Sequence, residues 1–292
     1  MSTDTNILTP TVELVTKYSP LVDELFTQES KASLVTNNDY DFTGAKEVKV
    51  YSIGTAPMND YDRSGDGANW SRYGEVQGID ATTQSLTLTK DRSFTFALDK
   101  MDEDETAQTL AAAGALARQL RQVAIPECDV RTYSVMAQGA GNVQEATLTA
   151  ETVYDAILAA SEVLDDALVP ETQRCILLPP RVYTMLKKSG VILQTDIAQD
   201  MLLKGVIAMI DGCLIVRVPA IRLPQGCNFM MCHPRATVSP IKLESLRIHT
   251  DPPGISGSLV EGRLYYDSFV LDNKKDGIYL HRLAGSGELP IV

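Results

Sequence analysis

The stretch TLTKDRSFTFALDKMDEDETAQTLAAAGALARQLRQVAIPECDVRTYSVMAQGA, residues 87–140, determines how we interpret the rest of the chain. In residues 93–98 (SFTFAL), large apolar side chains alternate with small ones, which predicts a strand. Asp102, with Glu105 three residues later, is typical of a capping box at the start of a helix. The segment that follows is rich in alanine, the strongest helix former. A strand that leads directly into a helix is therefore expected.

The predicted helix runs from about residue 102 to residue 138, where Gly139 supplies a stop. Its apolar residues recur at spacings of three and four: Leu110, Ala113, Ala117, Leu120 and Ala124. Pro126 lacks a backbone donor and its ring clashes with the preceding turn, so we expect a kink or a restart there. Unbroken, the helix would be roughly 55 Å long at about 1.5 Å per residue. Such a rod is much longer than an ordinary globular helix.

Composition limits the class of protein. The chain has 292 residues, 44% of them hydrophobic and 22% charged, as in an ordinary globular protein. Its formal net charge is −12, which argues against general nucleic-acid binding through Lys and Arg and favours solubility before assembly. We find no signal peptide and no apolar run long enough to span a membrane. The five cysteines are scattered, which indicates buried thiols in a reducing compartment.

The first 46 residues are predicted to form an arm. An amphipathic segment is expected over residues 12–26, with Leu21 and Phe26 among its apolar positions and Pro20 breaking or kinking it. The arm has too few large apolar residues to form a core of its own, so we expect it to lie on another surface.

A two-stranded ribbon is predicted next. Residues 47–54 should pair with residues 84–90, and a long segment rich in Gly, Asn, Asp and Ser separates them. Loops of this length are usually functional or disordered, and a ribbon alone is marginally stable in water. The segment contains residue types that are enriched at interfaces, so it is either an unpartnered surface loop or a contact with a neighbouring molecule. These residues are Arg63, Trp70, Arg72 and Tyr73.

A separate α/β block is expected over residues 148–235. It should contain a helix capped by Thr149, a buried strand at 175–178, helices at 180–188 and 196–203, and a strand at 228–232. Asp211-Gly212 is a strong hairpin signal between strands 206–210 and 213–218.

The tail returns to strands. Residues 243–249, 259–271 and 278–282 are expected to share one sheet with residues 93–98, with the long helix packed on it. The 148–235 block would then be inserted between the parts of a discontinuous domain.

Catalytic chemistry is not indicated. The three histidines are His233, His249 and His281, and the set Cys227, Cys232 and His233 is too small for a structural zinc site. Asp102–Glu105 is explained by a helix start. There is no nucleophile elbow, P-loop or dinucleotide fingerprint. We therefore expect no catalytic, cofactor-binding or metal-binding residues.

Several stretches resemble, in order, the major capsid proteins of tailed bacteriophages, which have the Hong Kong 97-type fold. TLTKDRSFTFALDKMDEDET is similar to the end of that family's extended loop where it enters the spine helix, and RQVAIPECDVRTYSVMA to the second half of that helix. RCILLPPRVYTMLKKS and GVIAMIDGCLIVRVPAIRLPQG resemble the axial domain. GRLYYDSFVLDNKKDGIYLH resembles the C-terminal strands of the peripheral domain.

The resemblance implies an α+β fold with defined parts. These are an N-terminal arm (1–46), an extended loop or β-hairpin (47–92), a peripheral domain with the spine helix (93–147), an axial domain (148–235), and C-terminal strands that complete the peripheral domain (236–292). The arm and the loop would reach neighbouring copies, so Arg63, Trp70, Arg72, Tyr73, Leu21 and Phe26 are the candidate inter-subunit contacts. Pro126 would mark a kink in the spine helix.

The implied function is structural and not enzymatic. Hexamers and pentamers of this chain would form an icosahedral shell around phage DNA, which is packaged without sequence recognition. The implied location is the virion, with assembly in the host bacterial cytoplasm. A separate scaffolding protein, a portal and decoration proteins are the expected partners, and a membrane is not.

Two departures from the family's pattern carry expectations. Because the arm-like sequence begins almost at Met1, we expect no N-terminal cleavage. Lys90 and Lys100 lie in or beside the loop, but nothing assigns them to a Lys–Asn isopeptide bond, so we expect shells that boiling SDS separates into monomers. Two alternatives remain: an encapsulin-type compartment that packages enzymes, and a cytosolic α+β enzyme of unknown reaction.

Overall fold

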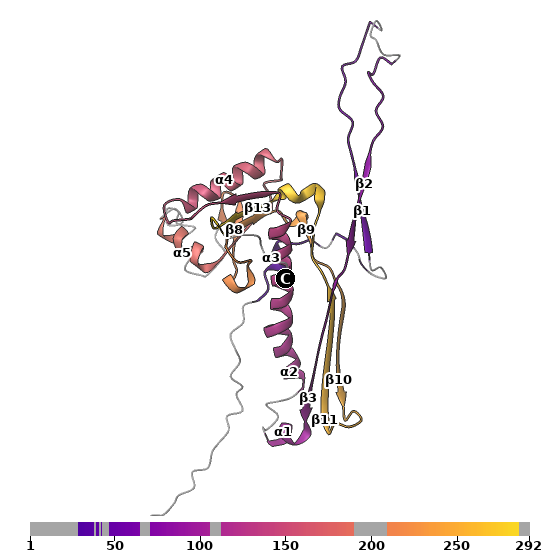
Figure 1. Ribbon diagram of the computed structural model, residues 1–292, viewed down its shortest axis with the longest axis vertical. Coiled ribbons are helices and arrows are strands. Elements are labelled where there is room, and N and C mark those ends of the chain that lie inside the picture. The colour runs from indigo at the N-terminus through magenta and orange to yellow at the C-terminus, as the bar shows by residue number, and fades with distance from the viewer. Residues whose placement is uncertain are drawn as a thin grey trace, which may run out of the picture.

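A mixed body of helices and sheets carries a projecting two-stranded ribbon (Figure 1). The computed structural model describes residues 29–37, 39–40, 42, 47–64, 71–105, 112–189 and 209–285. Within these ranges the strands form four sheets of two, three, two and six strands. The predicted helix at 196–203 and most of the strand at 206–210 lie outside the described residues.

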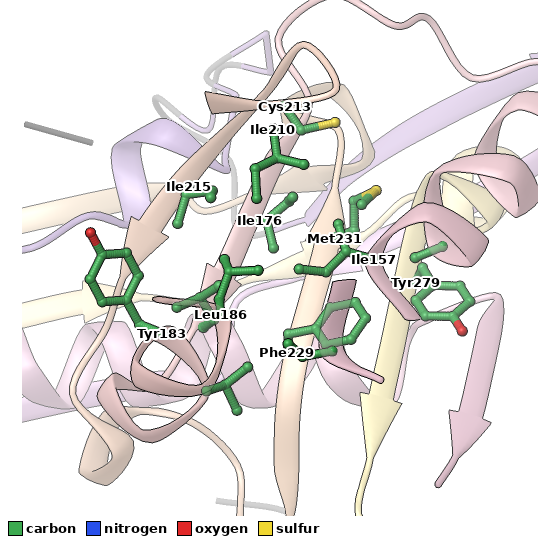
Figure 2. Close-up of a cluster of buried hydrophobic side chains, with 14 of the residues drawn as sticks. Ile157, Ile176, Tyr183, Leu186, Ile210, Cys213, Ile215, Phe229, Met231 and Tyr279 are labelled. Carbon is green, nitrogen blue, oxygen red and sulfur yellow. The ribbon is translucent and has the colours of Figure 1, made fainter. Parts of the chain in front are cut away.

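The six-stranded sheet forms the main core, with the order β4-β13-β8-β5-β7-β6. Its members are β4 (Asn142–Glu145), β5 (Cys175–Leu178), β6 (Met209–Ile210), β7 (Cys213–Arg217), β8 (Cys227–Cys232) and β13 (Ile278–Arg282). All four residues of β5 are buried, because both faces of the sheet are covered. Helices α4 (Val153–Asp166) and α5 (Pro180–Lys188) pack on one face, and α3 (Ile125–Gln138) packs on the other. Figure 2 shows Ile157 of α4, Leu186 of α5 and Phe229 of β8 in one buried cluster between these helices and the sheet.

Local signals explain several elements of this block. The strand 175–178 and the helix 180–188 are confirmed with these bounds. Asp211 and Gly212 both have positive φ, 49° and 71°, as the predicted two-residue turn between β6 and β7 requires. The helix predicted after Thr149 is present, but its N-cap is Thr152. Thr149 lies three residues earlier: its hydroxyl accepts from the Thr152 N–H at 3.3 Å, and the Thr152 hydroxyl accepts from the Thr149 N–H at 3.1 Å.

The long helix is continuous over residues 112–138 but changes type along its length. It consists of α2 (Ala112–Gln119), a π-helical turn (Leu120–Ala124) and α3. The Ile125 N–H bonds the Leu120 carbonyl, five residues back, immediately before Pro126. A π turn at this point is understandable, because Pro126 has no N–H to continue the α-helical ladder. Whether the rod bends there stays a prediction.

The helix start at Asp102 was predicted wrongly. Helix α1 (Lys100–Glu105) begins two residues earlier, because the carboxylate of Asp99 already accepts a hydrogen bond from the Met101 N–H at 2.8 Å. Residues 106–111, between α1 and α2, lie outside the described ranges.

A long three-stranded antiparallel sheet lies beside the rod (Figure 1). Its strands are β10 (Ile241–Thr250), β11 (Gly257–Tyr266) and β3 (Lys90–Asp99), with β11 in the centre. Leu264 of β11 packs against Leu120 and Ala124 of the rod. The prediction that strands before and after the α/β block share a sheet under the helix is confirmed for residues 93–98 and 243–266.

The same prediction is wrong for residues 278–282. Strand β13 lies in the six-stranded sheet, antiparallel to β8 and parallel to β4. Its residues Ile278–His281 are all buried. Successive side chains of a strand point to opposite faces, so both faces of β13 are covered, as is typical of a strand inside a sheet.

The predicted single strand 259–271 is broken at Asp267 and Ser268. Beyond them, β12 (Phe269–Val270) pairs with β9 (Thr237–Val238) in a separate two-stranded sheet. The two polar residues are buried and turn their side chains into hydrogen bonds with other elements, so the strand cannot continue.

Short elements complete the fold. They are the 3₁₀ turns η1 (Ala32–Leu34), η4 (Ala220–Arg222), η5 (Pro234–Ala236) and η6 (Asp272–Gly277), and the ribbon strands β1 (Glu47–Ile53) and β2 (Ala81–Thr87). Val48 pairs with Leu86 in the antiparallel ribbon, so the predicted pairing is confirmed for residues 84–87. The second strand runs from Ala81 to Thr87, three residues earlier than the predicted 84–90.

Candidate intermolecular surface

The base of the ribbon is fastened to the body through one apolar face. Leu86 is 1% exposed, and Leu88, which follows β2, is equally buried. Alternate residues of β1, Val48 and Val50, turn toward the same cluster, as the period of a strand requires. The cluster also contains Phe42, Val238, Phe269 and Leu271 from the arm and the tail. The base of the ribbon is therefore packed into the hydrophobic core of its own subunit.

The amide of Gln84 adds polar contacts at the base. Its Nε2 donates to the Val270 carbonyl at 2.9 Å, and its Oε1 accepts from the Asp272 N–H at 3.1 Å. Asn273 donates to the Ser52 hydroxyl on the paired strand. These bonds join both ribbon strands to β12 and to the segment that follows it.

Asp267 lies where the ribbon, the long sheet and the rod meet. Its carboxylate is 1% exposed and accepts from the Thr89 N–H at 2.9 Å and the Thr89 hydroxyl at 2.6 Å. It also accepts from Arg131 Nε at 3.0 Å and from the Ser268 N–H at 2.9 Å. Thr89 links the ribbon to β3, and Arg131 belongs to α3. One buried charge thus sets how the ribbon leaves the body.

Beyond its base the ribbon has no cover within the described residues. The outer face of β1 presents Tyr51 and Ile53, each 70% exposed. Further out, extended segments carry additional exposed apolar side chains: Met58, Tyr61, Tyr73, Val76 and Ile79. An apolar patch of this extent along a projection is a feature of interaction surfaces.

The predicted contact residues are placed as follows. Arg63, Arg72 and Tyr73 are all exposed in the outer part of the ribbon, and Tyr73 makes an edge-to-face contact with Tyr61 at 5.1 Å between ring centroids. The Arg72 carbonyl accepts from the Asp62 N–H at 2.9 Å, which brings the two sides of the tip together. Trp70, Leu21 and Phe26 lie outside the described residues.

Sequence reasoning missed the aliphatic members of this surface. Met58, Val76 and Ile79 are isolated apolar residues in a polar segment, and Tyr51 and Ile53 occupy the outward positions of an alternating strand. An apolar residue at an outward position of a ribbon with no covering helix was a usable signal.

The arm is anchored beside the rod by a buried ion pair. Arg222 donates to Asp129 at 2.7 Å, and the Ser30 hydroxyl donates to the other carboxylate oxygen at 2.6 Å. Burial raises the pKa of Asp129, whereas the bonds from Ser30 and Arg222 favour its charged form. The arm, α3 and η4 meet at this point.

Cys175, Cys213, Cys232, His233 and His281 are buried in the core, whereas Cys128 and Cys227 are partly buried and His249 is exposed. Within the described ranges no group of three His, Cys, Asp or Glu side chains could hold a metal ion. Burial raises the pKa of the Cys175 thiol to about 11 and that of Cys227 to about 12, which opposes nucleophilic chemistry. Cys232 and His233 are buried. None of the described helices combines the length and hydropathy needed to cross a membrane.

Comparison with known proteins identifies the fold. No protein-family model and no curated protein matches the chain. Among solved structures, a chain of Mycobacterium phage Che8 matches with a TM-score of 0.73 and 19% identity, over 93% of this chain and 97% of that one. A chain from the capsid structure of cyanophage P-SCSP1u matches with a TM-score of 0.70 and 14% identity, over 94% of each chain.

A chain from the asymmetric unit of the bacteriophage PhiM1 mature capsid matches with a TM-score of 0.69 and 12% identity, over 93% of this chain and 92% of that one. The protein therefore has the α+β fold of phage capsid structures, the Hong Kong 97-type fold. The likeness extends over 93–94% of this chain in these three comparisons.

Proposed function

We propose that this protein is a coat protein whose copies assemble, as hexamers and pentamers, into an icosahedral shell around phage DNA. The observation that carries this proposal is a capsid-type fold with a projecting ribbon that exposes Tyr51, Ile53, Met58 and Tyr73 to solvent. An isolated subunit gains no burial from these side chains, whereas a neighbouring copy would cover them. The role is structural, without catalysis.

In this proposal the parts of the chain have separate tasks. The arm (1–46) and the extended loop (47–92) reach neighbouring copies, and Arg63, Trp70, Arg72, Tyr73 and Leu21 are contact residues. The peripheral domain (93–147 with 236–292) spans the length of the subunit in the shell. The axial domain (148–235) surrounds the symmetry axes, and its sheet includes β4 and β13 from the flanking segments.

The proposed setting is the virion, with assembly in the host bacterial cytoplasm. A separate scaffolding protein, a portal and decoration proteins are the proposed partners. DNA is enclosed without sequence recognition, which is compatible with a net charge of −12 because the shell has only to contain it.

Electron microscopy and sedimentation of the purified protein test this function. Closed shells or capsomers are expected for the full chain, and deletion of residues 62–78 should leave a folded subunit that forms none. The matched control replaces residues 62–78 with a Gly/Ser linker of equal length, which keeps the spacing but removes the side chains. Shells formed by either variant would overturn the assignment of the ribbon tip.

The contents of the particle separate this proposal from its rivals. Phage DNA in particles from infected cells supports the coat protein. A cargo enzyme would instead indicate an encapsulin-type compartment. A small oligomer that never forms capsomers would favour an enzyme.

A further inference from the structure

An open groove lies between the long helix and the arm. It has a volume of about 420 Å³ and runs along the π turn and the first half of α3. Its floor and walls are mainly apolar: Leu120, Ile125, Cys128, Ile241, Leu264 and Tyr266. The hydroxyls of Ser33, Thr36 and Ser239 also line it. The Thr36 hydroxyl donates to the Ala32 carbonyl at 3.0 Å and the Ser239 hydroxyl bonds that of Ser268 at 2.9 Å, which leaves both oxygens able to accept a further hydrogen bond.

Two large apolar side chains that line the groove are about half exposed to solvent. Ile125 is 40% exposed and Ile241 is 56% exposed, although Leu264 and Tyr266 beside them are buried. Exposed isoleucines that border a groove lined by buried apolar residues indicate that a further apolar group belongs there.

The described part of the chain begins at residue 29, beside this groove. Ser30 lines it, and its hydroxyl is held on Asp129 at 2.6 Å. From Asp129 back to Leu120 is nine helical residues, or about 14 Å at 1.5 Å per residue. Phe26 precedes Ser30 by four residues, which can span at most about 14 Å. The chain ahead of Ser30 can therefore place Phe26 anywhere along the groove.

We propose that Phe26, with Leu25, occupies this groove in its own chain. The sequence offers these residues as the apolar end of an amphipathic segment, and the groove is the apolar surface within their reach. The lining hydroxyl oxygens could accept from backbone N–H groups of the inserted segment, which a purely apolar groove would leave unsatisfied. This inference does not depend on shell formation. It assigns Phe26 to its own subunit, whereas the sequence predicts an inter-subunit contact for that residue.

Alkylation of Cys128 in the unassembled full-length subunit tests the proposal. The Cys128 side chain lines the groove, and Cys227, which lines a different depression, is an internal reference. We expect Phe26→Asp to increase the rate of Cys128 alkylation by N-ethylmaleimide at least about tenfold. This corresponds to a loss of about 1.4 kcal/mol from the free energy that favours the state in which Cys128 is covered. Thr27→Asp, a neighbouring substitution with the same charge, should leave the rate unchanged.

Peptide mass spectrometry measures both rates in one sample, and thermal unfolding checks that both variants fold. Equal Cys128 rates in the wild type, Phe26→Asp and Thr27→Asp would overturn the proposal. An increase at Cys227 as large as that at Cys128 would indicate general loosening and would also overturn it.

A second variant identifies the copy that supplies the side chain. Phe26→Cys should form a disulfide with Cys128 under mild oxidation, and the product should run as a monomer without reductant. A disulfide-linked dimer, or protection of Cys128 that develops only on assembly, would assign the groove to a neighbouring copy and overturn the proposal.

Discussion

Arg131 of the long helix donates from Nε to the carboxylate of Asp267 at 3.0 Å, and only 16% and 1% of these two side chains are exposed. The bond joins the rod to the point where strand β11 stops. Because Thr89 donates to the same carboxylate twice, the geometry of the ribbon and the position of the rod depend on one charge.

Asp267→Asn is expected to lower the free energy of unfolding by about 3 kcal/mol, because Arg131 loses a buried countercharge and an amide cannot accept all four hydrogen bonds. Urea unfolding measures the change. Asp91→Asn is the matched control, since Asp91 pairs with Arg263 on an exposed face of the long sheet. Its effect should be too small to measure. Equal effects of the two substitutions would contradict this role for Asp267.

Phe94 covers the backbone of Gly262 across the long sheet. A Cβ on Gly262 would lie 2.2 Å from Cζ of the Phe94 ring. Gly262→Ala should therefore cost about 1–2 kcal/mol of stability through the displaced ring. In a Phe94→Ala background the same substitution should cost much less, and a double-mutant cycle from chemical denaturation measures the difference. Additive effects would refute the contact.

The two faces of β1 should respond differently to charge. Tyr51→Asp and Ile53→Asp alter the exposed outer face. We therefore expect the free energy of unfolding to change by no more than about 0.5 kcal/mol, while assembly is lost. Val50→Asp places a charge in the apolar cluster at the base and should loosen the ribbon itself. Hydrogen exchange of the ribbon amides and sedimentation separate the two outcomes. Normal assembly of the Tyr51 and Ile53 variants would rule out this face as a contact.

Acid should destabilise the subunit through its buried histidines. Burial lowers the pKa of His233 and of His281 below the ordinary value of about 6.5. The unfolded chain therefore binds more protons than the folded one as the pH falls below about 6.5, so stability decreases until the lowered folded-state pKa is reached.

The free energy of unfolding, measured between pH 7 and pH 5, should fall less steeply in His233→Gln/His281→Gln than in the wild type. His249→Gln is the control because that side chain is 44% exposed. An unchanged slope in the double variant would show that neither buried histidine contributes.

Local patterns predicted the parts of this fold whose causes are local. The turn at Asp211-Gly212 and the strand Cys175–Leu178 depend on a few neighbouring residues, and both are confirmed. The helix predicted after Thr149 is present, with Thr152 as its N-cap. The predicted helix start at Asp102 is wrong because another aspartate, Asp99, lies three residues earlier and its carboxylate accepts the hydrogen bond from the Met101 N–H.

Long-range competition could not be anticipated in the same way. Residues 278–282 were assigned to the wrong sheet, although a run of buried residues is typical of a strand covered on both faces. The break at Asp267 depends on Thr89, 178 residues away, and on Arg131, 136 residues away. The contact role of Arg63, Arg72 and Tyr73 stays a prediction, because a partner surface decides it.

The exposure of the outer ribbon also bears on how a shell could correct its own errors. Each long side chain at the tip, such as Tyr73 at 78% exposure, loses rotamer freedom when a neighbour covers it. That loss offsets part of the gain from burial, so a single contact between two copies stays weak and reversible. In the proposed shell, a misplaced copy held by one such contact would dissociate, whereas a copy held by all its neighbours would remain.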